Sequence, residues 1–450
     1  MPDLSDTIVS EATPPGRGAV RILRLSGARA LDLLDALFEP ESGPPPSHRA
    51  RSAVLGVFRG NGDAALDRCL ALAFPGPASF TGEDCAELHL HGSPGVLRAA
   101  MERCILLGAR PALPGEFSFR AFLGGKLSLL GAEATDALTA CETGDQALLF
   151  SPGSAHALEE EVRRLATDIG ELEAKMEASV DFPEEVAGPD GLPALMEDLG
   201  RKLADLAEAG LKSRPLREGW NVALVGAPNA GKSSLFNALL GRERAIVSPH
   251  PGTTRDVLAE TLDVGGLPLT LLDTAGGREP VDPLERLGVE AAARAASEAD
   301  AVLVVCDASR GWGIADRTVL ESCPFPPLAI LANKADLPAC GADPFPTGIP
   351  LLRTSAVDGS GLDALLDLLA RWMEGALPGG AHPMNARQAA AALEASRGMA
   401  RARESLREGF TEEVALQGIR DARSRLDEIL GGGNPETLYD RIFSRFCLGK

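Results

Sequence analysis

Hydrophobic and polar residues alternate in short runs along the first 120 residues of the chain. Such runs are typical of β-strands, because successive side chains of a strand point to opposite faces of its sheet. The strands predicted in this way cover residues 7–11, 19–25, 69–74 and 86–91. Turns rich in proline and glycine separate them, and a helix is expected over residues 95–107. Together these elements predict a small α+β domain.

From about residue 116 the hydrophobic residues recur every three or four positions, which is typical of amphipathic helices. The expected helical segments are 132–149, 156–180, 192–212, 385–408, 412–430 and 436–446. Between residues 217 and 376, predicted strands and helices alternate instead. The simplest interpretation is an α/β domain inserted into an all-helical domain whose two halves pack together.

We therefore predict a multidomain α/β and α protein with four segments. They are an N-terminal α+β domain over residues 1–120, the first half of a helical domain over 121–216, the inserted α/β domain over 217–376, and the second half of the helical domain over 377–450.

Composition and charge narrow the classes of function. Hydrophobic residues make up 45% and charged residues 24% of the 450 residues, which excludes a disordered chain. Lys and Arg total 44 against 64 Asp and Glu, so the net charge is −20. This charge excludes a protein that coats nucleic acid through its backbone, although a local basic site for one RNA element stays open. The uncharged apolar runs are too short to span a bilayer, which needs ~20 apolar residues.

The cysteines and the N-terminus bear on location. The 8 cysteines form no Cys-x-x-Cys pair, and the acidic N-terminus lacks the basic segment of an export signal. We therefore expect reduced thiols and a cytoplasmic protein.

The strongest chemical motif opens the inserted domain. An apolar strand predicted over 221–225 is followed by Gly-x-x-x-x-Gly-Lys-Ser at 226–233 and by a helix over 234–240. This order predicts a phosphate-binding loop, in which backbone N–H groups and the helix N-terminus face phosphate oxygens. Lys232 is expected at the β- and γ-phosphates and Ser233 at Mg²⁺. The alternative, a chance glycine turn, does not require every one of these residue types.

A second motif, Asp-x-x-Gly, follows the next predicted strand of the domain. The carboxylate of Asp273 can hold Mg²⁺ through water, and the N–H of Gly276 can meet the γ-phosphate. Alone this motif is weak and common. Here it comes about forty residues after the phosphate loop.

A third motif, Asn333-Lys334-Ala335-Asp336, follows the apolar strand predicted over 328–332. A carboxylate accepts both the N1–H and the 2-amino group of guanine, a pair of donors that adenine lacks. Ser355 and Ala356 are expected to support the base. Asn333–Asp336 alone is also compatible with an ordinary turn, but the three motifs in order predict that the ligand is GTP.

The segment 251–256, Pro-Gly-Thr-Thr-Arg-Asp, lies where GTPases carry a switch threonine that meets Mg²⁺ and the γ-phosphate. The residue after Asp-x-x-Gly is Gly277, which has no side chain to orient the attacking water as glutamine does in Ras-like enzymes. Either hydrolysis is slow, or another group acts.

At this point the chain resembles the MnmE (TrmE) family of GTPases. Within the inserted domain the resemblance is carried by Asn229, Gly-Thr-Thr-Arg-Asp at 252–256 and Asp-Thr-Ala-Gly at 273–276. It extends over the whole chain through residues 6–18, 79–84, 114–118 and 446–450. The resemblance implies an N-terminal domain that binds tetrahydrofolate and dimerises, a discontinuous helical domain and an inserted Ras-like P-loop GTPase domain.

The resemblance also implies a function and partners. Members work as homodimers with MnmG (GidA), a flavin- and NADH-dependent protein. By the same resemblance, the two proteins are expected to form a heterotetramer. The pair adds an aminomethyl or carboxymethylaminomethyl group to C5 of wobble uridine 34 of certain tRNAs. The one-carbon unit comes from 5-formyl- or methylene-tetrahydrofolate, and GTP hydrolysis is stimulated by K⁺. The acidic composition predicts weak direct tRNA binding, with the partner contributing most of it.

Residue by residue, the family's K⁺ ligands fall on Asn229, Ser248, His250 and Thr253. Ser248 and His250 depart from the expected threonine and hydrophobic residue. K⁺ binding would survive this departure if both contacts are backbone carbonyls, as expected, and for His250 a side-chain contact stays open. Mg²⁺ would be held by Ser233 and Thr254. The complete set of expected GTP-contacting residues is Asn229, Ala230, Gly231, Lys232, Ser233, Ser234, Ser248, Thr253, Thr254, Asp273, Thr274, Ala275, Gly276, Asn333, Lys334, Asp336, Ser355 and Ala356.

The family's catalytic glutamate, which orients the attacking water, falls on Glu285; from the sequence alone a solvated surface carboxylate is the commoner interpretation. A thiol near folate, Cys447, can act as nucleophile or acid–base group, or it can be a buried thiol of an apolar terminal helix. The expected catalytic residues are therefore Lys232, Thr254, Asp273, Gly276, Glu285 and Cys447.

The family's folate contacts fall on Arg24, Glu87, Lys126 and Lys450. The charges of Arg24 and Lys126 suit an anionic glutamyl tail, and Glu87 can accept paired donors of a pterin ring. Structural alternatives are that Arg24 closes a strand and Lys126 starts a helix. His89 and His91 share a strand face with Glu87, but we prefer a structural role for them, because zinc sites normally need three or four ligands.

Two classes of function remain at this point. The first is a GTPase subunit of a tRNA-modifying complex that also carries folate. The second is a regulatory GTPase whose flanking domains only bind a partner, as in ribosome-assembly GTPases. Those usually add a basic RNA-binding domain, which this sequence does not show. A one-carbon transferase with an idle GTPase domain ranks third.

Overall fold

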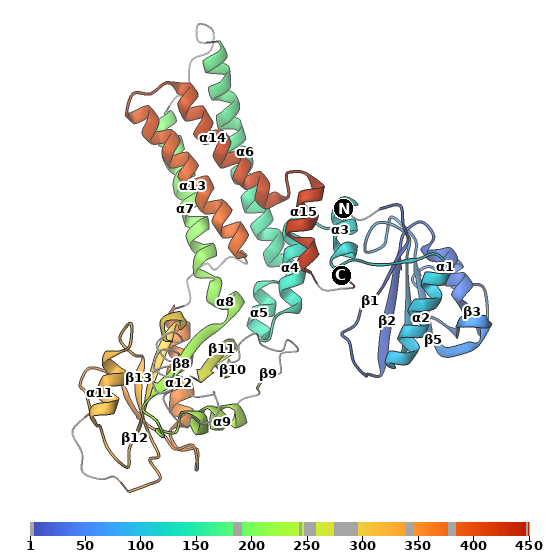
Figure 1. Cartoon of the computed structure of the whole chain (residues 1–450). Coiled ribbons are helices and arrows are strands. Elements are labelled where there is room, and N and C mark those ends of the chain that lie inside the picture. Colours follow the sequence, from blue (N-terminus) through green and yellow to red (C-terminus); the bar gives the residue numbers. More distant parts are fainter. Residues whose placement is uncertain are drawn as a thin grey trace, which may run out of the picture. The chain divides into compact units, whose positions relative to one another are not determined.

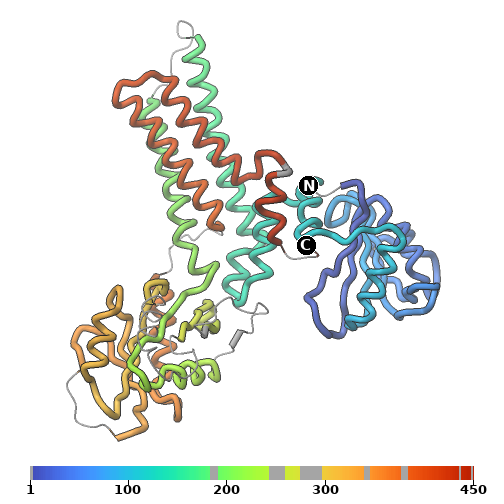
Figure 2. The backbone as a smooth tube through the Cα atoms, in the orientation of Figure 1, coloured from blue at the N-terminus to red at the C-terminus, as the bar shows by residue number. Residues whose placement is uncertain are grey.

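A computed structural model of the chain describes residues 4–182, 191–242, 245–246, 258–273, 296–338, 345–376, 384–446 and 449. Contacts divide the chain into two compact units. The first comprises Met1–Asp136, Ala155–Arg201 and Glu394–Lys450, and the second comprises Ala137–Ser154 and Lys202–Leu393. The chain leaves the helices in green, passes through an α/β domain and returns to helices in red (Figure 2). The predicted fold class is therefore confirmed, whereas the exact domain limits remain predictions.

A seven-stranded sheet opens the first unit, in the order β3-β4-β5-β6-β2-β1-β7. Its strands are β1 Ile8–Glu11, β2 Val20–Ser26, β3 Phe38–Pro40, β4 Val54–Arg59, β5 Ala65–Phe74, β6 Cys85–His91 and β7 Arg110–Pro111. Only the pair of β1 and β7 is parallel among these neighbours. Helices α1 (Ala30–Leu37) and α2 (Pro94–Leu106) cover one face of the sheet, and the core lies between (Figure 1).

The four predicted strands and the predicted helix of this domain are confirmed as β1, β2, β5, β6 and α2. The pattern does not predict α1, β3, β4 or β7. In β4, a Cβ on Gly56 would collide with the carbonyl of Glu39 and the ring of Phe38. The glycine is therefore required by the close approach of β3.

The two faces of this sheet differ in exposure. On β2, Leu23 and Leu25 are fully buried toward the helices. On the opposite face Val20, Leu55 and Leu70 are 53%, 39% and 38% exposed. Because side chains alternate along a strand, the half-buried Arg24 of β2 lies on this more open face.

Helices follow the sheet and return at the end of the chain. They are α3 Glu116–Leu123, α4 Leu129–Thr139, α5 Gly144–Leu149, α6 Pro152–Asp181, α7 Leu192–Lys212, α8 Arg214–Glu218, α13 Ala386–Arg407, α14 Glu412–Leu430 and α15 Pro435–Arg441. In the first unit α14 packs on α6, where Arg420 donates to Glu177 at 2.6 Å and Arg423 donates to Glu173 at 2.9 Å. Helices from the two sides of the insertion thus pack together.

Two predicted helical segments are interrupted in the structure. Segment 132–149 comprises α4 and α5, because Thr143 starts a new helix with a capping box. Its Oγ1 accepts the N–H of Gln146, whose side-chain oxygen accepts the N–H of Thr143 in return. Segment 436–446 comprises α15 and a separate 3₁₀ turn, Phe443–Arg445. Two further 3₁₀ turns lie at Pro46–His48 and Asn61–Asp63.

The second unit contains another seven-stranded sheet, in the order β14-β13-β12-β8-β11-β10-β9. Its elements are β8 Trp220–Gly226, α9 Lys232–Arg242, β9 Ala245–Ile246, β10 Leu258–Val264, β11 Leu267–Asp273, β12 Ala301–Asp307, α11 Ile314–Glu321, β13 Ala329–Asn333, β14 Leu351–Arg353 and α12 Leu362–Ala376. Strands β8, β11, β12, β13 and β14 run parallel, and β10 is antiparallel to both β9 and β11.

Hydrophobic cores lie on both faces of this sheet, as expected for parallel strands. The parallel strands end at one edge, where β8, β11, β12 and β13 finish at Gly226, Asp273, Asp307 and Asn333. Ligands of such sheets bind outside this edge. Among the described residues, no helix is both long and apolar enough to cross a membrane.

Candidate functional site

The phosphate loop leaves the central strand β8 and enters α9. Gly226 lies so close to β12 that a Cβ would collide with the carbonyl of Val305, and at Gly231 it would collide with Nδ2 of Asn333. Gly231 also has φ +93°, a conformation that favours glycine. Both glycines of the predicted motif are therefore required by the packing of the loop against neighbouring strands.

Lys232 is buried beneath this loop, where its Nζ donates to the carbonyls of Gly226 at 2.8 Å and Ala227 at 3.1 Å. Burial lowers the pKa of the Lys232 ammonium, while the carboxylate of Asp273 acts in the opposite direction. Asp273 itself is fully buried at the end of β11. The loop therefore holds a positive charge at its centre, where an approaching phosphate would be attracted.

The first turn of α9 presents two exposed hydroxyls, those of Ser233 and Ser234. The N–H groups of a first helical turn lack partners within the helix and carry positive partial charge. A hydroxyl oxygen in this position suits a hard cation such as Mg²⁺. The structure thus fits the predicted phosphate and Mg²⁺ contacts of this turn.

The predicted guanine-binding residues meet beside the same loop. Asn333 is buried, and its Nδ2 donates to the carbonyl of Ala230 at 3.1 Å. Asp336 is exposed, and one of its carboxylate oxygens accepts the hydroxyl of the buried Ser355 at 2.6 Å. Ala356 follows Ser355 in the same turn. A carboxylate fixed in this way keeps its other oxygen and remaining lone pairs available to guanine donors.

Asn229 lies at the exposed surface of the phosphate loop with φ +62°, a conformation that asparagine tolerates better than most residues. Its carbonyl accepts Nζ of Lys334 at 2.8 Å. Asp307, at the end of β12, binds the same ammonium at 2.7 Å. Asp307 was missed by the sequence interpretation, although its position after a buried strand matches that of Asp273 and Asn333.

Several predicted site residues lie outside the described part of the chain. They are Ser248, His250, Thr253, Thr254, Thr274, Ala275, Gly276, Glu285, Cys447 and Lys450.

A second polar site lies on the open face of the N-terminal sheet. Arg24 of β2 and Glu87 of β6 are direct partners in the strand register. Nε and Nη2 of Arg24 lie 3.0 and 2.9 Å from Oε1 of Glu87, and Nε2 of His89 lies 3.2 Å from Oε2. The hydrogen bond from His89 and the charge of Arg24 lower the pKa of Glu87 despite its burial. Glu87 is therefore an ionised acceptor.

The loop 79–84 and α3 complete the surroundings of this pair. The guanidinium carbon of Arg24 lies 5.3 Å from the ring centroid of the exposed Phe80 and 5.9 Å from that of the buried Phe117. Lys126 is exposed after the end of α3, and its stem lies beside Gly82 of the same loop. The predicted interpretation of Lys126 as the start of a helix is thus wrong, because α4 begins at Leu129. Arg24 lies within its strand rather than closing it.

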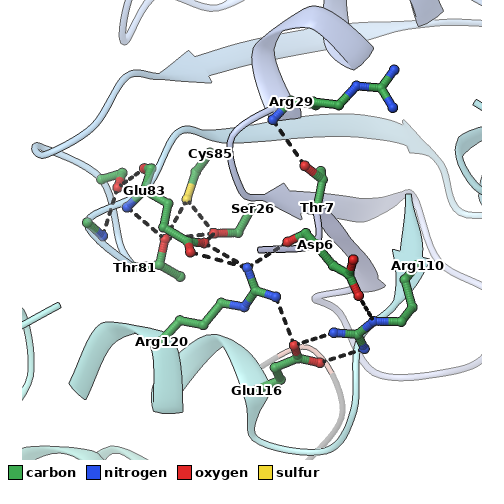
Figure 3. Close-up of polar contacts among 12 residues, drawn as sticks. Asp6, Thr7, Ser26, Arg29, Thr81, Glu83, Cys85, Arg110, Glu116 and Arg120 are labelled. Atoms are coloured by element: carbon green, nitrogen blue, oxygen red, sulfur yellow. Dashed lines mark hydrogen bonds and ion pairs between the residues drawn. The ribbon is translucent and has the colours of Figure 1, made fainter. Parts of the chain in front are cut away.

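A buried ionic network holds the loop 79–84 in place (Figure 3). Nη1 of Arg120 donates to both carboxylate oxygens of Glu83, at 3.2 and 3.1 Å, and Nη2 donates to Glu116 at 3.0 Å. Glu116 also accepts both Nη groups of Arg110, at 3.1 and 2.7 Å. Glu83 accepts the hydroxyl of Ser26 at 2.7 Å. The network joins α3 and β2 to the loop beside Arg24.

The two histidines of β6 contact carboxylates singly. His89 meets Glu87, and Nδ1 of His91 lies 2.6 Å from Oδ1 of Asp67. Within the described ranges, no group of three His, Cys, Asp or Glu residues is arranged to hold a metal.

The sheet, the phosphate loop and the guanine-binding residues define the class of this protein as a P-loop GTPase with an additional N-terminal α+β domain. The family model of the N-terminus of GTP-binding protein TrmE matches residues 7–126, and that of 50S ribosome-binding GTPases matches residues 221–334. The tRNA modification GTPase MnmE of Moorella thermoacetica is 40% identical over 99% of this chain and 100% of its own. That of Thermus thermophilus is 40% identical over 100% of both chains, and that of Synechococcus sp. JA-2-3B'a(2-13) is 38% identical over 99% of both. The chain therefore belongs to the MnmE family of tRNA modification GTPases.

Proposed function

We propose that this GTPase is stimulated by K⁺ and acts in the cytoplasm with an MnmG-like, FAD- and NADH-dependent protein. Together they add an aminomethyl or carboxymethylaminomethyl group to C5 of wobble uridine 34 of certain tRNAs. One observation carries the proposal. A guanine-binding site and the Arg24–Glu87 pair occur in one chain that is related to MnmE proteins over its full length.

Binding of GTP is supported by the edge of the second sheet. Lys232 would meet the β- and γ-phosphates, and Ser233 with Thr254 would hold Mg²⁺, which would neutralise charge on the phosphates. Asp336, oriented by Ser355, accepts the N1–H and 2-amino groups of guanine. Because the carboxylate would be left without donors by adenine, the site favours GTP over ATP.

Hydrolysis needs a group that orients the attacking water, because Gly277 has no side chain. We assign this role to Glu285. Asn229, with Ser248, His250 and Thr253, would hold K⁺, which would supply positive charge beside the phosphates as an arginine does in other GTPases. The exposure of Asn229 at the phosphate loop supports its part in this assignment.

The N-terminal domain binds 5-formyl- or methylene-tetrahydrofolate through Arg24, Glu87, Lys126 and Lys450. The ionised Glu87 accepts pterin donors, and the exposed Lys126 suits the anionic glutamyl tail. The contacts of Gly449 support the inclusion of Lys450. Gly449 packs so closely against the end of β1 that a Cβ there would collide with the carbonyl of Glu11. Cys447 is the candidate for covalent or acid–base chemistry.

Homodimer formation is assigned to the N-terminal domain. It is supported by the exposed apolar side chains Val20, Leu55 and Leu70 on the face of the sheet opposite α1 and α2, since contact with a second copy would remove them from water. The dimer joins the MnmG-like partner in a heterotetramer, and the partner contributes most of the tRNA binding.

The test is a calorimetric titration of the full chain with 5-formyltetrahydrofolate. The Arg24→Ala variant and a form truncated before Cys447 are compared with Arg68→Ala, a control that removes an exposed arginine from the same sheet. GTP hydrolysis is measured in parallel in KCl and in NaCl at equal ionic strength. We expect saturable binding that both test variants lose and the control keeps, and faster hydrolysis in KCl.

Absence of folate binding by folded protein that still hydrolyses GTP would overturn the folate assignment and leave a GTPase whose outer domains serve a partner. Equal rates in KCl and NaCl would overturn the K⁺ assignment independently.

A further inference from the structure

Asp307 is a carboxylate that no motif of the family resemblance includes, although it lies among the nucleotide-binding residues. It ends β12, and its neighbour in the parallel register is Asn333, the last residue of β13. The N–H of Ala308 donates to the carbonyl of Asn333 at 2.7 Å. The backbone of Asp307 is therefore fixed directly beside the start of Asn333–Asp336.

The side chain of Asp307 is equally constrained. Oδ1 accepts the N–H of Ser309 at 3.0 Å and its hydroxyl at 2.6 Å, and Oδ2 accepts Nζ of Lys334 at 2.7 Å. Only 11% of the side chain is exposed. Burial alone would raise the pKa of Asp307, but the hydrogen bonds from Lys334 and Ser309 outweigh it, and the pKa lies below its ordinary value. The carboxylate is thus ionised and already oriented.

Lys334 connects this carboxylate to the phosphate loop. Its Nζ donates to the carbonyl of Asn229 at 2.8 Å while it binds Asp307. Both Asn229 and Lys334 have φ +62°, a conformation that non-glycine residues adopt at a cost. The ammonium therefore connects two strained turns, one in the phosphate loop at Asn229 and one at the start of Asn333–Asp336.

We propose that Asp307 is a positioning residue for guanine nucleotides, which holds the Lys334 ammonium against the phosphate loop so that the lysine stem lies along the base. The inference rests on the proposed assignment of Asn333–Asp336 to guanine. A charge-assisted hydrogen bond is roughly twice as strong as a neutral one. The negative charge of Asp307 therefore keeps Lys334 in place when solvent competes for its ammonium.

Removal of this charge has a defined consequence. In Asp307→Asn the side chain keeps its size but loses its negative charge, and its single oxygen can no longer accept from both Ser309 and Lys334. The ammonium of Lys334 then leaves the carbonyl of Asn229 for water more often, and the turns at Asn229 and Lys334 separate more often. GDP and GTP bind more weakly, by about tenfold, because hydrogen bonds to charged groups contribute about that much. The chemical step at saturating GTP changes little, because Asp307 does not touch the phosphates.

The test measures the Kd and dissociation rate of a fluorescent GDP analogue with the full chain. The matched control is Asp300→Asn, which alters a carboxylate just before the other end of β12. Asp300 accepts the N–H of Asn221 at 2.9 Å, pairs with Arg214 and is 18% exposed. The control thus removes a similar charge far along the strand from the nucleotide edge. Lys334→Met and the double variant Asp307→Asn, Lys334→Met complete a thermodynamic cycle.

We expect Kd to rise about tenfold in Asp307→Asn and less than twofold in Asp300→Asn. In the Lys334→Met background, adding Asp307→Asn should raise Kd by less than a further twofold. The Tm of the nucleotide-free protein should stay within a few degrees of the wild type in Asp307→Asn and in Asp300→Asn, and kcat at saturating GTP should stay within about twofold in Asp300→Asn. An unchanged Kd in Asp307→Asn, or a full tenfold loss that persists in the Lys334→Met background, overturns the inference. If Lys334→Met itself leaves Kd unchanged, the assignment of Asn333–Asp336 to guanine fails first, and Asp307 loses its route of action with it.

Discussion

Glu116 offers the sharpest test of how the N-terminal domain holds its loops. Its side chain is 0% exposed, and that of Arg120 is 1% exposed. Glu116 accepts hydrogen bonds from Arg110, from Arg120 and from the N–H of Leu113 at 2.8 Å. Glu116→Ala removes every one of these acceptors at once and leaves two guanidinium groups without their shared carboxylate.

The expected cost follows from burial. Breaking a buried ion pair by removing one partner costs about 3–5 kcal/mol. In Glu116→Ala, Arg120 keeps its hydrogen bonds to Glu83 and Arg110 keeps Asp6, so we expect the lower end of this range, about 3 kcal/mol. The control is Glu39→Ala, since Glu39 pairs with Arg59 in the same sheet but is 60% exposed. Exposed pairs contribute about 0–1 kcal/mol. The difference between the two variants should therefore exceed about 2 kcal/mol, or more than a tenfold change in the opening equilibrium.

Hydrogen exchange of the full chain, followed by mass spectrometry, measures the local unfolding of each domain separately. Amides of β1, β2 and β6 should exchange more than tenfold faster in Glu116→Ala than in Glu39→Ala. All three tryptophans, Trp220, Trp312 and Trp372, lie in the second unit. Their fluorescence on heating should therefore be unchanged and provides an internal control.

The pH dependence gives an independent check. Burial alone would raise the pKa of Glu116, but hydrogen bonds from Arg110, Leu113 and Arg120 outweigh it and hold the pKa below its ordinary value of 4.5. A carboxylate with a depressed folded-state pKa stabilises the protein fully above its unfolded pKa, and that stabilisation is lost as the pH falls through the folded value. The difference between wild type and Glu116→Ala should be constant from pH 7 to about 5 and shrink below 4.5. Equal exchange in the two variants, or a difference that grows on acidification, would refute the reasoning.

Two further predictions concern the nucleotide edge. Gly231→Ala should weaken GDP binding at least tenfold in a fluorescence titration, because φ is +93° and the new Cβ would displace Nδ2 of Asn333; unchanged affinity would show that the loop rearranges freely. Asp336→Asn should weaken GTP binding about a hundredfold or more in competition assays and improve binding of xanthosine triphosphate, because the amide N–H₂ can donate to the 2-oxo group that xanthine carries. A uniform loss for both nucleotides would contradict the assignment.

The inserted domain could be predicted in detail because its signals are local. The phosphate loop and its flanking elements lie within about twenty consecutive residues, and each glycine has a role that the chain itself imposes, as the contacts of Gly226 and Gly231 demonstrate. The carboxylate of Asp307 carries no such signal. Many strands end in aspartate, and only the register of β12 against β13 brings it to Lys334.

The N-terminal domain shows the opposite situation. Arg24 and Glu87 are 63 positions apart, and their contact depends on the pairing of β2 with β6. Periodicity assigns each residue to a face of its strand but does not select the partner strand. Arg24 and Glu87 were therefore predicted from the resemblance to MnmE proteins. Only the structure shows that Glu87 contacts His89 and that Arg24 lies over Phe80.

The segment Pro114–Ser118 illustrates why a motif can be recognised before it is understood. The carbonyl of Pro114 accepts the hydroxyl of Tyr439 at 3.0 Å, and a Cβ on Gly115 would collide with the carbonyl of Phe443. Glu116 joins Arg110 to Arg120, and the ring of Phe117 faces Arg24. The residues from Pro114 to Phe117 thus each have a partner outside the segment, on the C-terminal turn, in the ionic network or on the open sheet face. A change at any of these positions should therefore be transmitted to the Arg24–Glu87 pair, because all of them lie in the first turn of one short helix, α3, or directly before it.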